Sequence, residues 1–399
     1  MTDLEKKLYD AVLADHGYVV ALRRELHRCP ELSAEEYETQ AIIERELDKL
    51  GIAHRRVAKT GVIAELTGTA PSDAPRCIAL RADIDGLPVA EESGAPYASR
   101  NPGRMHACGH DAHTASLLGT ARVLSAAREL FSGKVIFVWQ PGEETGYGGR
   151  IIVDEGDIDE TQRSFGLHLA SEVPVGKVVV MAGPNNAAVD WFNVRVHGLG
   201  AHVSTPEKGV DALYIASQIV VGAQAIVARQ TNPMENVVVG IGRMSAGTAY
   251  NVVAQEAELE GTVRTLTPEL RKATVARVEA LVHSTAALYG GSAEILWHDN
   301  TSPLINDEAA SREAQKTAVS LFGADMVITQ RRPALGGDDF AEFILRVPGV
   351  YAYVGSGNPA LPNTVVAHHN SHFDIDEDCL TTAAALTCCY TVEYLNGLV

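Results

Sequence analysis

Two apolar runs, each followed by polar residues, constrain the fold more than any other feature of the chain. Residues 77–84 and 134–139 are dense in Val, Ile, Leu, Ala and Phe, as strands buried on both faces are. A helical pattern over residues 114–130 separates them. The order strand, helix, strand predicts a βαβ unit with parallel strands. Asp83 and Asp85 at the end of the first run then lie where open α/β sheets bind their ligands.

A different order of elements occupies residues 188–299. The pattern there predicts strand, helix, strand, strand, helix and strand, which is a ferredoxin-like unit. Since 399 residues favour two domains and α/β character returns after Pro303, we expect an insertion. The predicted fold is an α/β domain with a mixed, mostly parallel sheet, interrupted by a βαββαβ domain. The expected boundaries are residues 1–186 and 301–399 for the first domain and 187–300 for the inserted one.

The composition argues against several classes of protein. The formal net charge is -18, whereas binding to nucleic acid or an anionic membrane needs a basic face. No apolar run reaches the roughly 18 residues of a membrane span, and the charged N-terminus lacks a signal peptide's apolar core. Six scattered cysteines without a CxxC pair favour reduced thiols. We therefore expect a cytoplasmic protein with neither nucleic-acid nor membrane partners.

Residues 105–113, Met-His-Ala-Cys-Gly-His-Asp-Ala-His, gather one Cys and three His within nine positions. Thiolate, imidazole and carboxylate together form a set that a divalent metal can bind. Later turns and strand ends add more donors, so that the candidate ligands are Cys108, His110, Glu144, His168 and His369. Five ligands, one of them a thiolate able to bridge, suit two metals about 3.5–4 Å apart. The residues expected to support these ligands are Asp111, Asp83 or Asp85 as orienting carboxylates, and His106 and His113 as framework.

Adjacent Glu143 and Glu144 follow the second apolar run, in the motif Gln-Pro-Gly-Glu-Glu. Neighbouring side chains at a strand end point in different directions, so one carboxylate can bind metal while the other faces the attacking water. The second would act as general base and pass the proton to the leaving nitrogen. The pair therefore suggests hydrolysis of an amide.

His202 is the candidate residue of the inserted domain. It precedes Thr205-Pro206, which fits an N-cap followed by a proline at the first helical position. A helix N-terminus favours anions and developing negative charge, so His202 is expected to stabilise an oxyanion. Gly198 and Gly200 lack the third glycine of a dinucleotide-binding fingerprint.

The motifs together resemble a known family. MHACGHDAHT, QPGEE, a GxGAH loop, EGTVRT and HHNSHFDID look like the dinuclear-metal amidohydrolases of the aminoacylase and carboxypeptidase type. LRRELHRCPELS and RADIDGLP resemble the branch of hippurate hydrolases and auxin-conjugate hydrolases. The resemblance covers nearly the whole chain.

This resemblance implies roles for individual residues. It implies that Cys108 bridges two metals, that Glu143 is the general base, and that His202 in a lid domain stabilises the oxyanion, often across a dimer interface. Asn251 and Arg264 match positions that bind the substrate carboxylate in related enzymes. A homodimer or higher homo-oligomer formed through the lid is also implied, and an exposed sheet edge gives a physical reason for it.

Some residues depart from the family pattern. Gly337-Asp338-Asp339-Phe340 stands where Ser-Glu-Asp-Phe is usual, and Ala112 replaces a commoner Gly. Asp338-Asp339 is interpreted as a cap of the following helix, with the edge of the pocket as the alternative. His368 and His372 flank His369, which leaves the register of that ligand open.

The expected activity is metal-dependent hydrolysis of the amide bond in N-acyl amino acids, small amino-acid conjugates or dipeptides. Two divalent ions are expected, manganese or zinc first, with nickel or cobalt also compatible with the donors. One rival hypothesis is a cysteine hydrolase with Cys108 as nucleophile and His110 or His113 as base. Another is a binding protein for amino-acid conjugates without catalytic activity, which the presence of Glu143 argues against.

Overall fold

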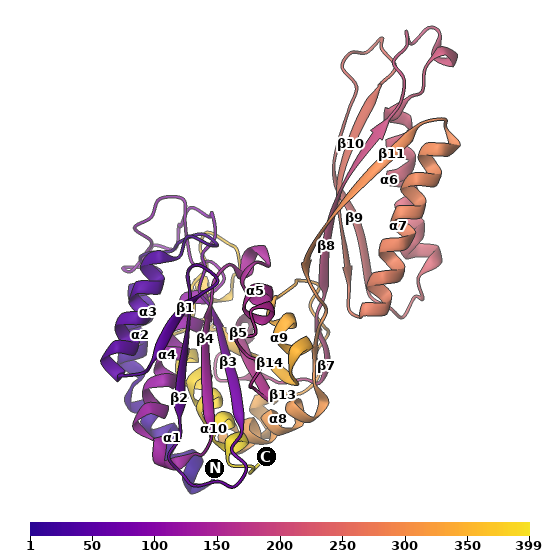
Figure 1. Cartoon of the computed structure of the whole chain (residues 1–399). Helices are drawn as coiled ribbons and strands as arrows, with labels where there is room; N and C mark the ends of the chain where they lie inside the picture. Colours follow the sequence, from indigo (N-terminus) through magenta and orange to yellow (C-terminus); the bar gives the residue numbers. More distant parts are fainter. The chain divides into compact units, whose positions relative to one another are not determined.

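The computed structural model describes residues 1–399, and the contacts between its elements divide the chain into two units (Figure 1). Unit 1 contains Met1–Gly183, Asn306–Arg332 and Asp339–Val399, and unit 2 contains Pro184–Ile305 and Pro333–Asp338. The sequence predicts that residues 301–399 all belong to the first domain. The structure corrects this, because the short segment Pro333–Asp338 belongs to unit 2. It lies with unit 2 because its backbone bonds to that unit, as in the Ala187 N–H donated to the Gly336 carbonyl at 3.1 Å.

Unit 1 is built on an eight-stranded sheet in the order β1-β2-β4-β3-β5-β14-β6-β13. Pairings among β4, β3, β5 and β14 are parallel, while β1–β2, β2–β4 and β14–β6 are antiparallel. The strands are β1 (His54–Val57), β2 (Gly61–Thr67), β3 (Cys77–Asp83), β4 (Lys134–Gln140), β5 (Arg163–Pro174), β6 (Val178–Val179), β13 (Val327–Ile328) and β14 (Gly349–Gly357). The predicted mixed, mostly parallel sheet is confirmed.

Helices cover both faces of this sheet, which explains why every residue of β3 is buried. Phe165 contacts Tyr390 of α10, whereas an added side chain at the neighbouring Gly166 would meet Phe340 of α9. Because successive strand residues face opposite sides, α10 and α9 cover opposite faces. The helices are α1 (Asp3–Ala14), α2 (His16–His27), α3 (Tyr37–Leu50), α4 (His110–Ala126), α5 (Gly148–Asp154), α8 (Glu308–Phe322), α9 (Phe340–Arg346) and α10 (Cys379–Leu395).

Unit 2 has a four-stranded antiparallel sheet in the order β11-β8-β10-β9, with two helices packed on it. The element order is βαββαβ, as the sequence predicts. Its elements are β8 (Ala188–His197), α6 (Ala212–Gln230), β9 (Val237–Ala246), β10 (Glu256–Thr265), α7 (Pro268–Leu288) and β11 (Ser292–Thr301). A separate two-stranded sheet consists of β7 (Gly183–Asn186) and β12 (Leu304–Asn306).

Helix α6 corrects the expectation that no apolar run is long enough for a membrane span. By length and composition alone, α6 is long and apolar enough to cross a membrane. In the structure, 33% of this stretch is buried. Ile215, Ile219 and Ile226 of α6 belong to the core of unit 2, whereas Val221 is 67% exposed. The helix is therefore the core helix of a small domain that also presents apolar side chains on its outer face.

Two helix starts differ from the sequence pattern. Helix α6 begins at Ala212, where Asp211 caps the backbone N–H groups of Leu213 and Tyr214, while Thr205-Pro206 begins only a short 3-10 turn. His202 therefore does not lie at the N-terminus of a long helix, and the physical reason offered for its role is wrong. Similarly, Ser33-Ala34-Glu35-Glu36 has the sequence of a capping box, but α3 begins at Tyr37 without a side-chain cap.

Candidate metal centre

A glycine places two of the predicted ligands at the start of α4. Gly109 precedes the helix with a φ of 91°, a left-handed conformation that glycine adopts without strain. Cys108 lies before this bend and His110 is the first helical residue, four positions earlier than the pattern predicts. Both side chains are buried, with His110 fully so.

Donor atoms from three other segments lie close to this pair. The Cys108 Sγ is 3.4 Å from the Nε2 of His168, which lies within β5 rather than at its end. The Oε1 of Glu144 is 4.0 Å from the His110 Nε2 and 3.4 Å from the His369 Nε2. The donor atoms of Cys108, His110 and Glu144 all lie within 4.8 Å of one another. The structure thus brings all five predicted ligands to one place in unit 1.

Two of these donors lack the partners that buried polar atoms normally have. The Nε2 of His110 and the Oε1 of Glu144 are both buried without a hydrogen-bond partner. Orphaned buried polar atoms in a folded protein require an explanation, and an ion that is not part of the structure is one. Since the set consists of a thiol, imidazoles and a carboxylate, these residues fit a divalent metal.

Asp85 orients two of the candidate ligands. Its Oδ1 is 3.0 Å from the Nδ1 of His110, and its Oδ2 accepts hydrogen bonds from the Glu144 N–H at 3.1 Å and the Ser33 hydroxyl at 2.7 Å. A proton on Nδ1 leaves the lone pair of the His110 Nε2 pointing into the site. The Nδ1 of His168 lies 2.6 Å from the Leu169 carbonyl, which selects the same tautomer there.

His113 is fully engaged in the framework, as the sequence predicts. Its Nδ1 lies 2.6 Å from the Oδ1 of Asp83, and its Nε2 accepts the backbone N–H of Leu169 at 2.9 Å. Asp83 also accepts a hydrogen bond from Arg81 at 2.6 Å. Asp83 therefore orients His113 and lies 3.8 Å from the His110 Nε2 without bonding to it.

Asp111 and His106 are both buried next to the ligands in sequence. Asp111 turns away from the ligand set, because its Oδ2 accepts Arg23 Nε at 2.8 Å and lies 2.7 Å from His27 Nδ1. Both ring nitrogens of His106 are buried without a partner, and burial lowers its pKa to about 4. Asp111 thus acts on the site through the start of α4 rather than through a ligating imidazole.

The two neighbouring histidines of the last motif have different surroundings. His368 Nδ1 lies 3.2 Å from the Cys108 carbonyl, and its Nε2 accepts the Ser171 N–H at 3.4 Å. His369 adopts a φ of 66°, and its N–H donates to the Ala107 carbonyl at 2.8 Å. A positive φ in a non-glycine residue is strained and is held by its surroundings. It directs His369 toward Glu144.

The pKa shifts of the site show that its electrostatic field favours a positive charge. The close approach of Cys108 and then of Glu144, whose Oε1 lies 3.4 Å away, raises the pKa of His369 to about 10. Burial alone would raise the pKa of Asp85, yet the hydrogen bond to His110 holds it below its usual value. Burial and then the charge of Glu144 raise the pKa of Cys108. A cation at this point would relieve the same anionic field that makes His369 basic.

Comparison with known proteins places this geometry in a family. Residues 79–391 match the model of peptidase family M20/M25/M40. The chain belongs to this family. The predicted relationship to the aminoacylase and carboxypeptidase type of amidohydrolase is therefore confirmed, and the M20 chain is a hydrolase.

Individual M20 relatives match over nearly the full length. An N-acetyl-L-cysteine deacetylase of Bacillus subtilis is 38% identical over 367 residues, which cover 92% of this chain and 85% of the relative. An IAA-amino acid hydrolase of Arabidopsis thaliana is 32% identical, with coverage of 96% and 86%. The crystal structure of a dinuclear metal-binding M20 peptidase from Bacillus subtilis has a TM-score of 0.83 and 36% identity, with coverage of 96% and 99%.

The remaining candidates of the M20 chain lie in unit 2. His202 is exposed, and its Nδ1 accepts the Ser204 N–H at 3.1 Å. Asn251 lies beside it, since its carbonyl accepts the Val203 N–H at 3.1 Å. Arg264 lies near the far end of β10, where it donates to the Leu335 carbonyl at 3.1 Å.

The two groups are separated by the length of β10. His202 pairs with Val252 just before that strand, which begins at Glu256, whereas Arg264 is its last residue but one. Eight residues of extended chain correspond to roughly 26 Å. The structure therefore does not bring His202 and Asn251 together with Arg264 within unit 2.

Several side chains that organise the site were not among the residues predicted from the sequence. Arg81 donates to Asp339 at 2.7 Å as well as to Asp83, and Asp339 also accepts Gln140 at 2.6 Å. Asp339 is therefore buried beneath the sheet end and makes no side-chain cap to α9, contrary to the interpretation as a helix cap. Arg81 belongs to the motif RADIDGLP and Ser33 to LRRELHRCPELS, so both residues lie in motifs that the sequence singles out. Their roles were not predictable, because the partners Asp339 and Asp85 are distant in sequence.

Proposed function

We propose that this M20 hydrolase cleaves the amide bond of N-acyl amino acids or small amino-acid conjugates and dipeptides in a metal-dependent reaction. The observation that carries the proposal is the pair of orphaned donors, His110 Nε2 and Glu144 Oε1, inside a cluster of five ligand-type residues. The names of the matched relatives, a deacetylase of N-acetylcysteine and a hydrolase of an amino-acid conjugate, support the substrate class.

The site would hold two divalent ions, manganese or zinc first, with nickel or cobalt as alternatives. The ligands would be Cys108, His110, Glu144, His168 and His369, and the Cys108 thiolate has the lone pairs that sharing between two ions would require. When bound, the ions lower the pKa of the attacking water and polarise the scissile carbonyl. The M20 structure that binds two metals supports this number.

Glu143 would be the general base. It adjoins Glu144 in a short 3-10 turn, and its Oε2 lies 4.0 Å from the His110 Nε2. A carboxylate at this position would take the proton of the attacking water and deliver it to the departing nitrogen. The products would be a carboxylic acid and an amine, which is a free amino acid when the substrate is an N-acyl amino acid.

We also propose that unit 1 is the catalytic domain and that unit 2 is a lid that completes the site. His202 would stabilise the oxyanion, and Asn251 and Arg264 would bind the substrate carboxylate. Because His202 and Arg264 are separated along β10, one small substrate could contact both only if the lids of two subunits contributed. A homodimer through unit 2 meets this requirement, and the edge strand β9 with the exposed Met244 offers a surface for it.

The proposal is tested with a panel of N-acyl amino acids and dipeptides, with the metal content measured on the same preparation. Wild type should turn over members of the panel, and Glu143→Gln should reduce kcat by at least about 100-fold without releasing the metal. Glu155→Gln, a change at an exposed glutamate of the same unit, is the matched control. Full activity after chelation would refute the metal mechanism and support Cys108 as nucleophile, and metal binding without turnover of any substrate would support a binding protein.

A further inference from the structure

A fully buried arginine joins two of the segments that carry candidate ligands. Arg23 of α2 donates from Nε to Asp111 at 2.8 Å, from Nη2 to Asp374 at 2.9 Å and from Nη1 to Glu377 at 3.4 Å. Its side chain has no exposed surface, and neither does that of Asp111. We call these four residues the Arg23 cluster.

The carboxylates of the Arg23 cluster come from both sides of the metal centre. Asp111 immediately follows His110 at the start of α4, and Asp374 lies five residues after His369. Every nitrogen of the guanidinium therefore donates a hydrogen bond. Nε donates to Asp111, in the segment of His110, and the two Nη atoms donate to Asp374 and Glu377, in the segment that follows His369. Arg23 is the cation that all three carboxylates share, and each carboxylate has a further side-chain partner: His27 for Asp111, Tyr97 for Asp374 and Arg24 for Glu377.

We propose that Arg23 is a positioning residue that sets the separation of His110 and His369, and thereby the affinity of the centre for its divalent ions. The inference rests on the proposed function in that the centre must hold metal. The backbone bond from His369 to Ala107 is a second connection between the two segments, so Arg23 adjusts a geometry that does not depend on it alone.

The chemistry of the side chain explains why this position holds an arginine. A guanidinium is planar and can donate in three directions at once, whereas the ammonium of lysine is a compact charge on a flexible stem. His27 lies four residues further along α2, and its Nδ1 is 2.7 Å from the same oxygen of Asp111. A lysine would keep the positive charge of the cluster without reaching both segments.

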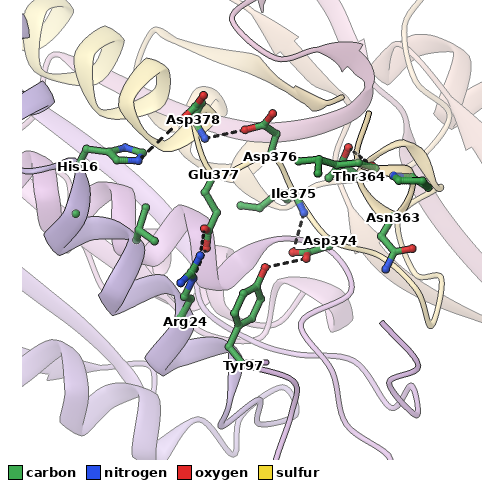
Figure 2. Close-up of a pocket in the computed structure, with 14 residues that line it drawn as sticks. His16, Arg24, Tyr97, Asn363, Thr364, Asp374, Ile375, Asp376, Glu377 and Asp378 are labelled. Carbon is green, nitrogen blue, oxygen red and sulfur yellow. Dashed lines mark hydrogen bonds and ion pairs between the residues drawn. The ribbon is translucent and has the colours of Figure 1, made fainter. Parts of the chain in front are cut away.

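The outer side of the Arg23 cluster forms part of the wall of a cavity of about 690 Å³ (Figure 2). Arg24 lines this cavity and binds Glu377 through two hydrogen bonds of 2.9 and 2.6 Å. It also lies over the Tyr97 ring at 4.9 Å, as Arg23 does at 4.8 Å. Arg24 thus shares two partners with Arg23 but does not bond to Asp111, and it provides a matched control.

The experiment compares Arg23→Lys and Arg24→Lys in the full-length protein. Metal affinity is measured by competition with a chromophoric chelator, and the geometry of the site by the visible absorption spectrum of the Co²⁺-loaded protein. Arg23→Lys should weaken metal binding about 10–100-fold and change the Co²⁺ spectrum, as loss of a residue behind the ligands does. Arg24→Lys should match wild type, and excess metal should restore kcat of Arg23→Lys, which it would not do for a protein that had merely lost structure.

A folded Arg23→Lys protein with wild-type metal affinity and Co²⁺ spectrum would overturn the inference. If Arg23→Lys does not fold, Asp374→Asn decides, because it removes one negative partner while keeping the shape of the side chain. Asp374→Asn should then weaken metal binding, and unchanged binding would overturn the inference. A wild-type protein that binds no divalent ion would instead refute the proposed function, so the two failures are distinguishable.

Discussion

Asp85 holds His110 through a contact of 3.0 Å to Nδ1 and holds the backbone N–H of Glu144 with its other oxygen. One buried carboxylate thereby orients two candidate ligands from separate segments. Asp85→Asn should reduce metal affinity about 10–100-fold, because a neutral amide stabilises the Nδ1–H of His110 less well. Equilibrium dialysis with Mn²⁺ or Zn²⁺ measures the change.

Ser33→Ala is the control for that substitution. It removes only the hydroxyl that donates to Asp85 at 2.7 Å and leaves both ligand contacts in place. We expect a much smaller loss of metal affinity than in Asp85→Asn. Equal losses in the two variants would show that the position of Asp85, rather than its charge on His110, is what matters.

The two adjacent histidines His368 and His369 should behave differently when each is replaced by Asn. His369→Asn should lower the number of bound ions per chain, since Asn tolerates the positive φ but cannot replace Nε2 as a ligand. His368→Asn should preserve the stoichiometry and lower the free energy of unfolding by about 1 kcal/mol, because its nitrogens bond to backbone groups.

Metal analysis of both purified proteins decides the register of this ligand. The donor atoms of His368, Cys108 and His168 also lie within 4.8 Å of one another, so the alternative has a structural basis. Loss of an ion in His368→Asn together with full occupancy in His369→Asn would reverse the assignment.

The elements that were predictable from the sequence are those whose signal is local. The apolar runs that became β3 and β4 are buried at nearly every position, and a strand of that kind is recognisable without knowledge of its neighbours. The ligand types clustered around Cys108 were recognisable for the same reason.

The features that could not be predicted depend on distant partners or on competition between local signals. Arg23 bonds to Asp111 and Asp374, which lie 88 and 351 positions further along the chain, and no pattern in α2 indicates these partners. Thr205-Pro206 begins a short 3-10 turn without a side-chain cap, and Asp211 caps the long helix instead. His202 therefore lies in the loop where the sequence places it, but not at the N-terminus of a long helix, which was the predicted reason for its role.

Asp339 should contribute strongly to stability. It accepts hydrogen bonds from Arg81 at 2.7 Å, Gln140 at 2.6 Å and the Gly149 N–H at 2.9 Å, and it is fully buried. Arg81 would keep its ion pair with Asp83, but the buried donors of Arg81, Gln140 and Gly149 would all lose this acceptor, so Asp339→Ala should cost roughly 3–5 kcal/mol in the free energy of unfolding. Urea unfolding measures it, with the exposed Asp325→Ala as control.

The stability of the chain should depend on pH through a buried pair of carboxyl groups, Glu5 of α1 and Glu393 of α10. Burial and the neighbouring charge of Glu5 raise the pKa of Glu393 above its usual 4.5, although a hydrogen bond from Thr317 opposes the shift. Glu5 accepts the Ser320 hydroxyl at 2.7 Å, which helps to hold its pKa below the usual value in spite of burial.

The sign of the effect follows from the raised pKa of Glu393. A carboxyl group with a raised pKa in the folded state stabilises the fold below pH 4.5, and this contribution is lost as the pH rises through the folded-state value. Glu393→Gln should keep a neutral hydrogen-bonding group at every pH and raise the free energy of unfolding at pH 7 by about 1 kcal/mol. The measurement is Tm from pH 4 to 8, where the variant should gain on wild type as the pH rises. Parallel curves for the two proteins would show that Glu393 does not carry this pH dependence.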